Sequence, residues 1–185
     1  MGVRMESRLA GLALLLSLGA GCTELPAAPR DHPAGTGSVG PLILEGAVAS
    51  LEQLAFETLE GIGANDRDRL ERLRLTEYQH NQLVWPQLPA SRPEANYPVD
   101  FAWTNIELRN RRALGRILWD FGGHELALLG VECRAAPERF ASFRVLKDCW
   151  VSFTLDRREA APQQFFRYVL DWDGQYKVFR FYDPD

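Results

Sequence analysis

The stretch EYQHNQLVWPQLP, residues 77–89, brings together the side chains most capable of chemistry: Tyr78, His80 and Trp85. On a helix, Tyr78 and Trp85 share nearly the same face, and that face excludes His80. A histidine outside an apolar face is usually a surface residue, so we do not expect His80 to act as a ligand or a base. Together with Trp103, Tyr78 and Trp85 are candidates for the rim of a pocket that binds a small molecule. The alternative is that these aromatic rings pack in the core under a capping helix.

Motifs for metal-dependent or nucleophilic catalysis are absent from the sequence. After the first 41 residues the histidines are His80 and His124, which fall on separate predicted elements, and neither an HExxH nor a CxxC pattern occurs. A glycine-rich phosphate loop and a GxSxG turn are also missing, and few serines remain for a Ser–His–acid triad. We therefore expect no metal, no cofactor and no catalytic residue of these classes.

The cysteines Cys133 and Cys149 form an even pair once Cys22, near the N-terminus, is set apart. In an oxidising compartment such a pair favours a disulfide, with two buried free thiols as the alternative. The segments 124–134 and 143–156 are predicted strands, and one antiparallel register places the two cysteines opposite each other. The same register pairs apolar residues on one face and opposite charges on the other: Val131 with Val151, Leu129 with Phe153, Ala127 with Leu155, and Arg134 with Asp148.

Two arginines in the C-terminal segment 167–182 are candidates for an anion-binding site. Asp173-Gly174 predicts a hairpin with a two-residue type I′ turn, and the resulting register places Arg167 directly opposite Arg180. Like charges in that position destabilise the sheet unless an anion or a nearby acid answers them. The alternative is a solvent face on which both side chains splay into water. The rest of this register pairs Phe166 with Phe181, Tyr168 with Phe179, and Val169 with Val178.

Helices are predicted to precede the strands that position these residues. Apolar spacing predicts a helix over 42–60 and a second one, capped by Asn65 or Asp66, through residue 73. Thr76 to Gln79 match a capping box for a short helix over 77–84 that Pro86 should stop. After a proline-rich loop, Asp100 is expected to cap a long helix that Gly122-Gly123 ends near residue 121.

The composition indicates one ordinary globular domain. The 185 residues are 46% hydrophobic and 25% charged, which is enough for a sizeable core. The formal net charge is -4, and arginines alternate with acids, as in NDRDRLERL, so these segments should be solvated helix faces. A nucleic-acid partner is therefore not expected.

Residues 1–21 have the pattern of an export signal. Arg4 and Arg8 flank the start of the apolar run LAGLALLLSL, which is too short to span a bilayer comfortably. The following LGAGC resembles a bacterial lipobox, which implies that Cys22 is the lipidated first residue of the mature protein; an ordinary secretory signal and an uncleaved anchor are the alternatives. The resemblance, with Thr23 after the cysteine, implies anchoring in the cell envelope, at the outer membrane facing the periplasm. Residues 22–41 are then a disordered Pro/Gly tether before the domain 42–185.

The order of helices followed by a four-stranded meander predicts an α+β fold. It resembles the nuclear transport factor 2-like fold, whose curved antiparallel sheet wraps round a long helix to form a cone. Residues 100–182 carry the match, with the helices of 42–84 as the other wall. EYQHNQLVWPQLP and VLDWDGQYKVFRFY also resemble an uncharacterised family of bacterial secreted proteins, which implies no particular activity.

The resemblance implies a cavity between sheet and helices, and ketosteroid isomerase, a relative with this fold, uses a carboxylate there as a general base. Glu132, Asp148 and Asp120 are the carboxylates available for such a role, although Glu132 and Asp148 are predicted on the polar face. We expect a non-catalytic domain that binds an apolar small molecule or an envelope protein. The alternatives are a small isomerase- or hydrolase-like enzyme with a pocket carboxylate, and a structural envelope component.

Overall fold

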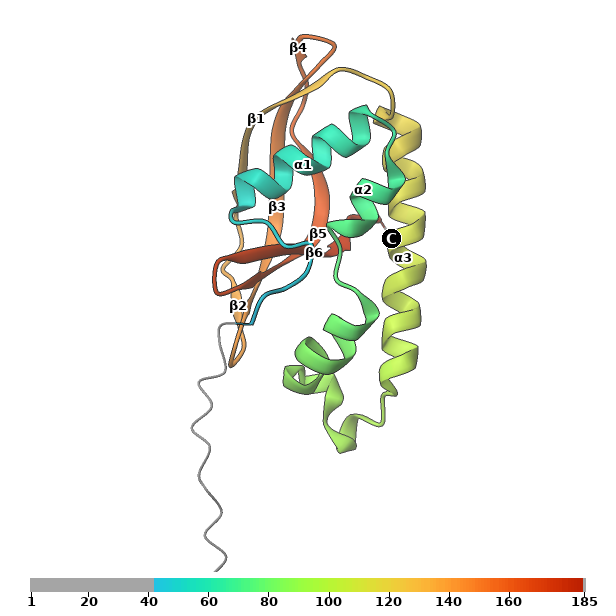
Figure 1. Ribbon diagram of the computed structural model, residues 1–185, viewed down its shortest axis with the longest axis vertical. Coiled ribbons are helices and arrows are strands. Elements are labelled where there is room, and N and C mark those ends of the chain that lie inside the picture. Colours follow the sequence, from blue (N-terminus) through green and yellow to red (C-terminus); the bar gives the residue numbers. More distant parts are fainter. Residues whose placement is uncertain (1–41, 185) are drawn as a thin grey trace, which may run out of the picture. The chain divides into compact units, whose positions relative to one another are not determined.

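Helices pack against one antiparallel sheet in the computed structural model, which describes residues 42–184 (Figure 1). The predicted α+β class is confirmed for this range. The predicted signal peptide 1–21, the predicted lipidation at Cys22 and the predicted tether 22–41 fall outside the described residues.

The first two helices begin at side-chain caps. Helix α1 (Leu51–Gly63) starts after Ser50, whose hydroxyl accepts a hydrogen bond from the Gln53 amide. It therefore begins later than the predicted residue 42, because the preceding segment pairs with the sheet: Val48 and Tyr176 exchange two backbone hydrogen bonds of 3.1 and 2.8 Å. Helix α2 (Arg67–Arg72) is capped by Asp66, one of the two predicted caps.

The predicted capping box at Thr76 is confirmed. The Gln79 amide donates to the Thr76 hydroxyl and the Thr76 amide donates to the Gln79 side-chain oxygen, both at 3.1 Å. The helix that follows is a π-helix, η1 (Gln79–Val84), which ends at the predicted residue 84. Pro86 does not stop helical conformation altogether, because a 3-10 turn, η2 (Trp85–Gln87), follows directly and contains it. Two more 3-10 turns, η3 (Pro89–Ser91) and η4 (Pro93–Ala95), fill the proline-rich loop.

The long helix α3 (Val99–Phe121) contacts α1, η1 and β6. Pro98 precedes it without a side-chain cap, so the prediction that Asp100 caps it is wrong, and Asp100 lies instead in its first turn, where an acidic group favours the helix dipole. Gly122 ends the helix as predicted. A Cβ at Gly122 would lie 2.3 Å from the Leu118 carbonyl oxygen, so the chain can turn there only with glycine.

The four long strands form the predicted meander, in the order β1-β3-β5-β6. Asp173 and Gly174 both have positive φ, 52° and 80°, as the predicted type I′ turn requires. Short strands β2 (Glu138–Arg139) and β4 (Arg158–Glu159) pair with β3. The bounds of the long strands are β1 Leu126–Cys133, β3 Arg144–Leu155, β5 Gln163–Trp172 and β6 Gln175–Phe181.

The register predicted between β1 and β3 is correct near the cysteines and shifts beyond Gly130. Cys133 pairs with Cys149, and the two are joined in a disulfide as predicted. An irregularity between Leu128 and Gly130 then places Leu128, not Leu129, opposite Phe153. Leu129 is consequently 56% exposed. At the other end Arg134 meets Asp148 only through the backbone, because its guanidinium pairs with Glu132. The shift also leaves Leu126, not Ala127, opposite Leu155.

The main core lies between the sheet and the helices α1, α2 and α3. Helix α1 contacts β1 and β6, and α3 contacts β6. A second apolar cluster forms where Leu44 and Val84 meet residues of β3 and β5. The largest fully buried side chains include phenylalanines from β3, β5 and β6: Phe153, Phe165, Phe166 and Phe181.

Lys177, on β6, is buried to 1% exposure, and its ammonium donates to the Glu45 carbonyl oxygen at 2.6 Å. Burial, only partly offset by the charge of Glu45, lowers the pKa of Lys177 from 10.5 to about 8. Below pH 8 both the folded and unfolded chains carry this proton, and the burial costs about 3 kcal/mol. Between about pH 8 and 10.5 the unfolded chain binds more protons, so stability should rise with pH.

We therefore expect Lys177→Met to raise the free energy of unfolding at pH 7 by about 1–2 kcal/mol, after the loss of one hydrogen bond. The Glu45 oxygen keeps its bond from Gln79 Nε2 at 3.1 Å. Denaturant unfolding at pH 7 measures the gain in stability of the variant, and a second measurement at pH 10 measures how the stability of each protein changes with pH. Lys147→Met, at a 37% exposed side chain, is the matched control and should leave the pH dependence intact. A Lys177→Met protein with the same pH dependence as the parent would contradict the assignment.

Candidate functional site

His80 lies in the first turn of η1 with an exposed fraction of 0%. The prediction that it is a surface residue is wrong. A π-helix closes its hydrogen bonds from residue i to i+5, here from the Trp85 amide to the His80 carbonyl, so it has more residues per turn than an α-helix. The inward face therefore includes His80. For the same reason Tyr78 is not on the face of Trp85 and is 71% exposed.

Aromatic rings surround the imidazole from three different elements. The ring centroids of Trp85, Trp103 and Phe179 lie 5.8, 5.4 and 6.1 Å from that of His80. These residues come from η2, α3 and β6, so the histidine sits where the short helices, the long helix and the sheet meet. Trp85 and Trp103 thus each contact the His80 ring.

A cavity of about 330 Å³ opens beside His80. We call it the His80 pocket; it combines apolar side chains with one amide and two guanidinium groups. This volume is within the range of sites that bind small molecules. Its lining residues are His80, Trp85, Leu88, Tyr97, Ala102, Asn105, Ile106, Arg109 and Arg180.

The two ring nitrogens of His80 have different environments. Nδ1 lies 2.6 Å from the Asn81 side-chain oxygen, which can only accept, so Nδ1 carries the hydrogen. Nε2 is buried and has no hydrogen-bond partner within residues 42–184. Burial lowers the pKa of His80 below its ordinary value, against smaller raising effects of the Asn81 hydrogen bond and the charge of Glu77. The imidazole is therefore neutral at pH 7, and Nε2 presents a lone pair.

The predicted residues are only partly gathered in this pocket. Trp85 lines it, Trp103 contacts the His80 ring without lining the cavity, and Tyr78 lies away from it on the surface. Sequence reasoning missed His80. The pattern of residues 77–84 predicts a regular helix, on which His80 faces away from Trp85, and no feature of the sequence marks the π-helix that turns it inward.

The prediction that Arg167 lies opposite Arg180 is wrong. Phe166 pairs with Phe181 and Val169 with Val178 as predicted, but shifts on both sides of Tyr168 place Tyr168, not Arg167, opposite Arg180. The predicted pair of Tyr168 with Phe179 is lost for the same reason. Both guanidinium carbons lie over the Tyr168 ring, that of Arg167 at 5.9 Å and that of Arg180 at 5.5 Å. The two arginines therefore line different pockets.

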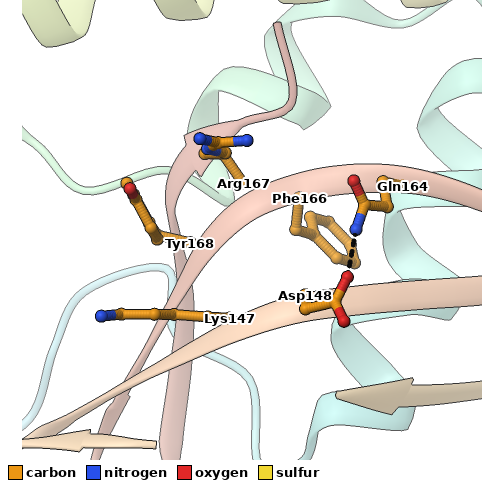
Figure 2. Close-up of a pocket in the computed structure, with 6 residues that line it drawn as sticks. All are labelled: Lys147, Asp148, Gln164, Phe166, Arg167 and Tyr168. Atoms are coloured by element: carbon orange, nitrogen blue, oxygen red, sulfur yellow. Dashed lines mark hydrogen bonds between the residues drawn. The ribbon is translucent and has the colours of Figure 1, made fainter. Parts of the chain in front are cut away.

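Arg167 lines a second pocket of about 230 Å³ between β3 and β5 (Figure 2). Figure 2 shows the Gln164 amide directed at the Asp148 carboxylate, with a hydrogen bond of 2.6 Å. Asp148 also accepts from the Trp150 indole at 2.8 Å and has a positive φ of 54° beside an irregularity in the pairing of β3 with β5. Its carboxylate is thus engaged in holding this irregular strand.

The other predicted carboxylates do not approach the His80 pocket. Glu132 is exposed and pairs with Arg134, and Asp120 is exposed at the end of α3. His124 is likewise exposed and lies 3.0 Å from Asp156, whose pKa is lowered, first of all by this hydrogen bond. Within residues 42–184, no cluster of three or more potential metal ligands occurs.

The lining of the His80 pocket combines a neutral imidazole, two arginine side chains and aromatic rings. Such an arrangement can hold and orient an organic molecule. No helix among residues 42–184 has both the length and the apolar character needed to cross a membrane. Comparison with known proteins adds no assignment, since the chain matches no family model, no curated protein and no solved structure.

Proposed function

We propose that residues 42–184 form a non-catalytic domain that binds a small organic molecule in the His80 pocket. The observation that carries the proposal is the cavity of about 330 Å³ itself, which lies where the short helices, the long helix and the sheet meet and has aromatic, aliphatic and polar lining residues. One lining residue is His80, whose Nε2 atom is buried and has no hydrogen-bond partner among the described residues. Leaving a buried polar atom unsatisfied costs about 1–3 kcal/mol, and a bound molecule that brought a donor within reach of Nε2 would remove this cost.

Binding is favoured over the alternative of a cavity enzyme that uses a carboxylate. The lining residues of the His80 pocket include no aspartate or glutamate. Asp148 lines the other pocket, where its carboxylate already accepts hydrogen bonds from Trp150 and Gln164. A general base needs an available lone pair near the reacting proton, which these contacts oppose.

The proposal is tested with a library of ring compounds that contains neutral, cationic and anionic members in equal parts, screened by ligand-observed NMR against the full chain. Hits should bind the parent protein and a Tyr78→Ala control, because Tyr78 is 71% exposed. They should be lost in Ala102→Phe, which fills the pocket from α3, and in Ile106→Trp if Ala102→Phe folds poorly. Hits that survive both filled variants would place binding elsewhere and reject the proposal.

We propose further that the α+β domain has a cone-like fold of the nuclear transport factor 2-like type. The helices followed by a four-stranded meander support the cone-like, nuclear transport factor 2-like arrangement. In that arrangement the sheet curves round α3 and the binding cavity lies between them. An experimental structure with a flat sheet would reject it.

We also propose that the domain is tethered to the bacterial envelope through lipid on Cys22, at the outer membrane facing the periplasm. The apolar run and LGAGC support this proposal. Several acyl chains on one cysteine would anchor the protein stably. A palmitate analogue should label the parent protein in cells but not Cys22→Ala, and label on the variant would reject the anchor.

A second candidate, binding of an envelope protein, is favoured by the outer face of α3. Phe101, Leu108 and Trp119 fall on one side of this helix and are 55%, 42% and 89% exposed. Isolated apolar residues are common on surfaces, whereas a stripe along one helix face is typical of a contact. The binding of a small molecule in the His80 pocket does not depend on this face.

A further inference from the structure

We propose, resting on the proposed binding function, that the ligand is an elongated molecule with a ring at one end and an unbranched apolar tail at the other. The ring lies in the His80 pocket, and the tail lies in a neighbouring cavity of about 320 Å³, which we call the tail cavity. Leu88 lines both cavities and is the residue that selects straight tails over branched ones.

The tail cavity is largely apolar, and its two charged lining residues pair with each other. The Lys147 ammonium forms an ion pair with the Glu138 carboxylate, so the lining presents balanced charges. Such a surface favours hydrocarbon over a polar group, because removing apolar surface from water is favourable. The remaining lining residues are aliphatic or aromatic: Leu88, Pro89, Ala90, Phe140, Val145, Tyr168 and Phe179.

Two residues connect the tail cavity with the His80 pocket. Leu88 is a lining residue of both. Phe179 lines the tail cavity, and its ring centroid lies 6.1 Å from that of His80 and 6.3 Å from that of Tyr168, another lining residue of the tail cavity. The two cavities are therefore neighbours with a shared wall, and one molecule can extend from the first into the second past Leu88.

The volumes favour one ligand across both cavities. Sites for small organic molecules usually have volumes of roughly 300–1,000 Å³. The His80 pocket, at about 330 Å³, and the tail cavity, at about 320 Å³, each lie near the lower limit, whereas a site made of both lies well inside the range. The Trp85 and Tyr97 rings lie 6.2 Å apart at 31° in the lining of the His80 pocket, so the ring of the ligand belongs at this end.

The backbone holds Leu88 in place between the two cavities. Leu88 is extended, with φ -79° and ψ 144°, between the 3-10 turns η2 and η3, because the residue before a proline avoids helical angles. Its amide donates to the Trp85 carbonyl at 3.0 Å, and its carbonyl accepts from the Ser91 amide at 3.0 Å and from the Ser91 hydroxyl at 2.8 Å. A tail that passes Leu88 must be slim, because this backbone cannot withdraw the side chain.

The walls of the tail cavity are fastened to one another across the sheet. The Gln87 side-chain oxygen accepts from the Ser142 amide at 2.9 Å, and the Gln87 side-chain nitrogen donates to the Leu83 carbonyl at 3.1 Å. Gln87 thus joins η2 to the turn between β2 and β3, which also carries Phe140. The short helices and the turn therefore form the cavity before a ligand binds.

The test measures the binding of para-alkylphenols, from ethyl to hexyl, to the full chain by calorimetry. We expect the affinity to rise about two- to fourfold with each added CH₂ group, because the group leaves water for the tail cavity. The straight-chain butyl compound should bind at least about fivefold more tightly than the tert-butyl compound, which collides with Leu88.

Variants of the full chain assign these effects to residues. Ala90→Trp fills the tail cavity and should remove the dependence on chain length, while ethylphenol binds as in the parent protein. Ala90→Leu is the milder filling if thermal melts show that Ala90→Trp folds poorly. Ala95→Trp, at an exposed residue of η4 that lines neither cavity, is the matched control and should keep the dependence. Leu88→Ala should remove the preference for the straight over the branched butyl compound.

The outcomes separate this inference from the proposed function. If the affinity does not rise with chain length, or rises equally in the filled variants, the tail cavity is rejected although short phenols bind in the His80 pocket. If Leu88→Ala keeps the preference for the straight chain, the role of Leu88 is rejected. If no alkylphenol binds at concentrations up to about 1 mM, the elongated class fails, and the library screen then decides the proposed function alone.

Discussion

Removing both carboxylates that pair with Arg74, in a Glu71→Gln/Glu107→Gln protein, is expected to lower the free energy of unfolding by about 3–5 kcal/mol. The Arg74 side chain is 4% exposed and forms ion pairs with Glu71 of α2 and Glu107 of α3. The residues on either side of it, Leu73 and Leu75, exchange backbone hydrogen bonds with Val178 of β6. Arg74 thus links α2 and α3 next to the sheet. Once both glutamates are replaced by neutral glutamines, its buried positive charge has no counter-charge, and this destabilises the folded state.

Two further variants make this expectation specific. Adding Arg74→Met to the double variant should restore most of the loss, because an apolar side chain of similar length needs no counter-charge. Glu125→Gln breaks an ion pair on the surface, in which the side chain of Arg157 is 83% exposed and that of Glu125 is 61% exposed. It should lower the free energy of unfolding by at most about 1 kcal/mol. Equal costs for the buried and the exposed variants, measured by denaturant unfolding, would contradict the account of Arg74.

Reduction of the Cys133–Cys149 disulfide is expected to lower the free energy of unfolding by about 3 kcal/mol. The bond joins β1 to β3 across a sequence separation of 16 residues, and the unfolded chain gains entropy when this loop opens. Denaturant unfolding of the same protein with and without a phosphine reductant measures the effect without a change of packing. A Cys133→Ala/Cys149→Ala protein should not respond to the reductant, and a parent protein that is equally insensitive would contradict the prediction.

Much of the fold could be predicted because local signals agreed with the tertiary structure. The cap at Asp66, the capping box at Thr76 and the Asp173-Gly174 turn each depend on residues close in sequence. The cysteine pairing depended on two strands whose apolar alternation specified one register. These features require no knowledge of distant parts of the chain.

The errors in strand register and in the placement of His80 have a common physical cause, which is an irregularity in an otherwise regular element. The irregularities near Leu129 and Arg167 each shift a strand register by one position, and the π-helix adds residues to a turn. A shift of one position moves a side chain to the other face, which separated Arg167 from Arg180. Packing against the rest of the domain selects these irregularities, so the sequence pattern alone does not locate them.

The candidate site was predicted less well than the fold for the same reason. Trp85 and Trp103 were identified as aromatic candidates, but the residue between them in space, His80, was assigned to the surface. Its burial depends on contacts with Phe179 of β6, a residue far away in the sequence. A site assembled from η1, α3 and β6 is therefore visible only in three dimensions.

The central claim is that the His80 pocket binds a small organic molecule, and heteronuclear NMR of the His80 imidazole nitrogens, recorded while a hit from the ring-compound library is added, tests it most directly. The chain has 3 histidines, so the His80→Phe protein assigns the signals. At pH 7 the account predicts a neutral ring with its hydrogen on Nδ1, and His80 signals that shift as the hit binds. A doubly protonated ring, or His80 signals that stay unchanged while the hit binds, would contradict it.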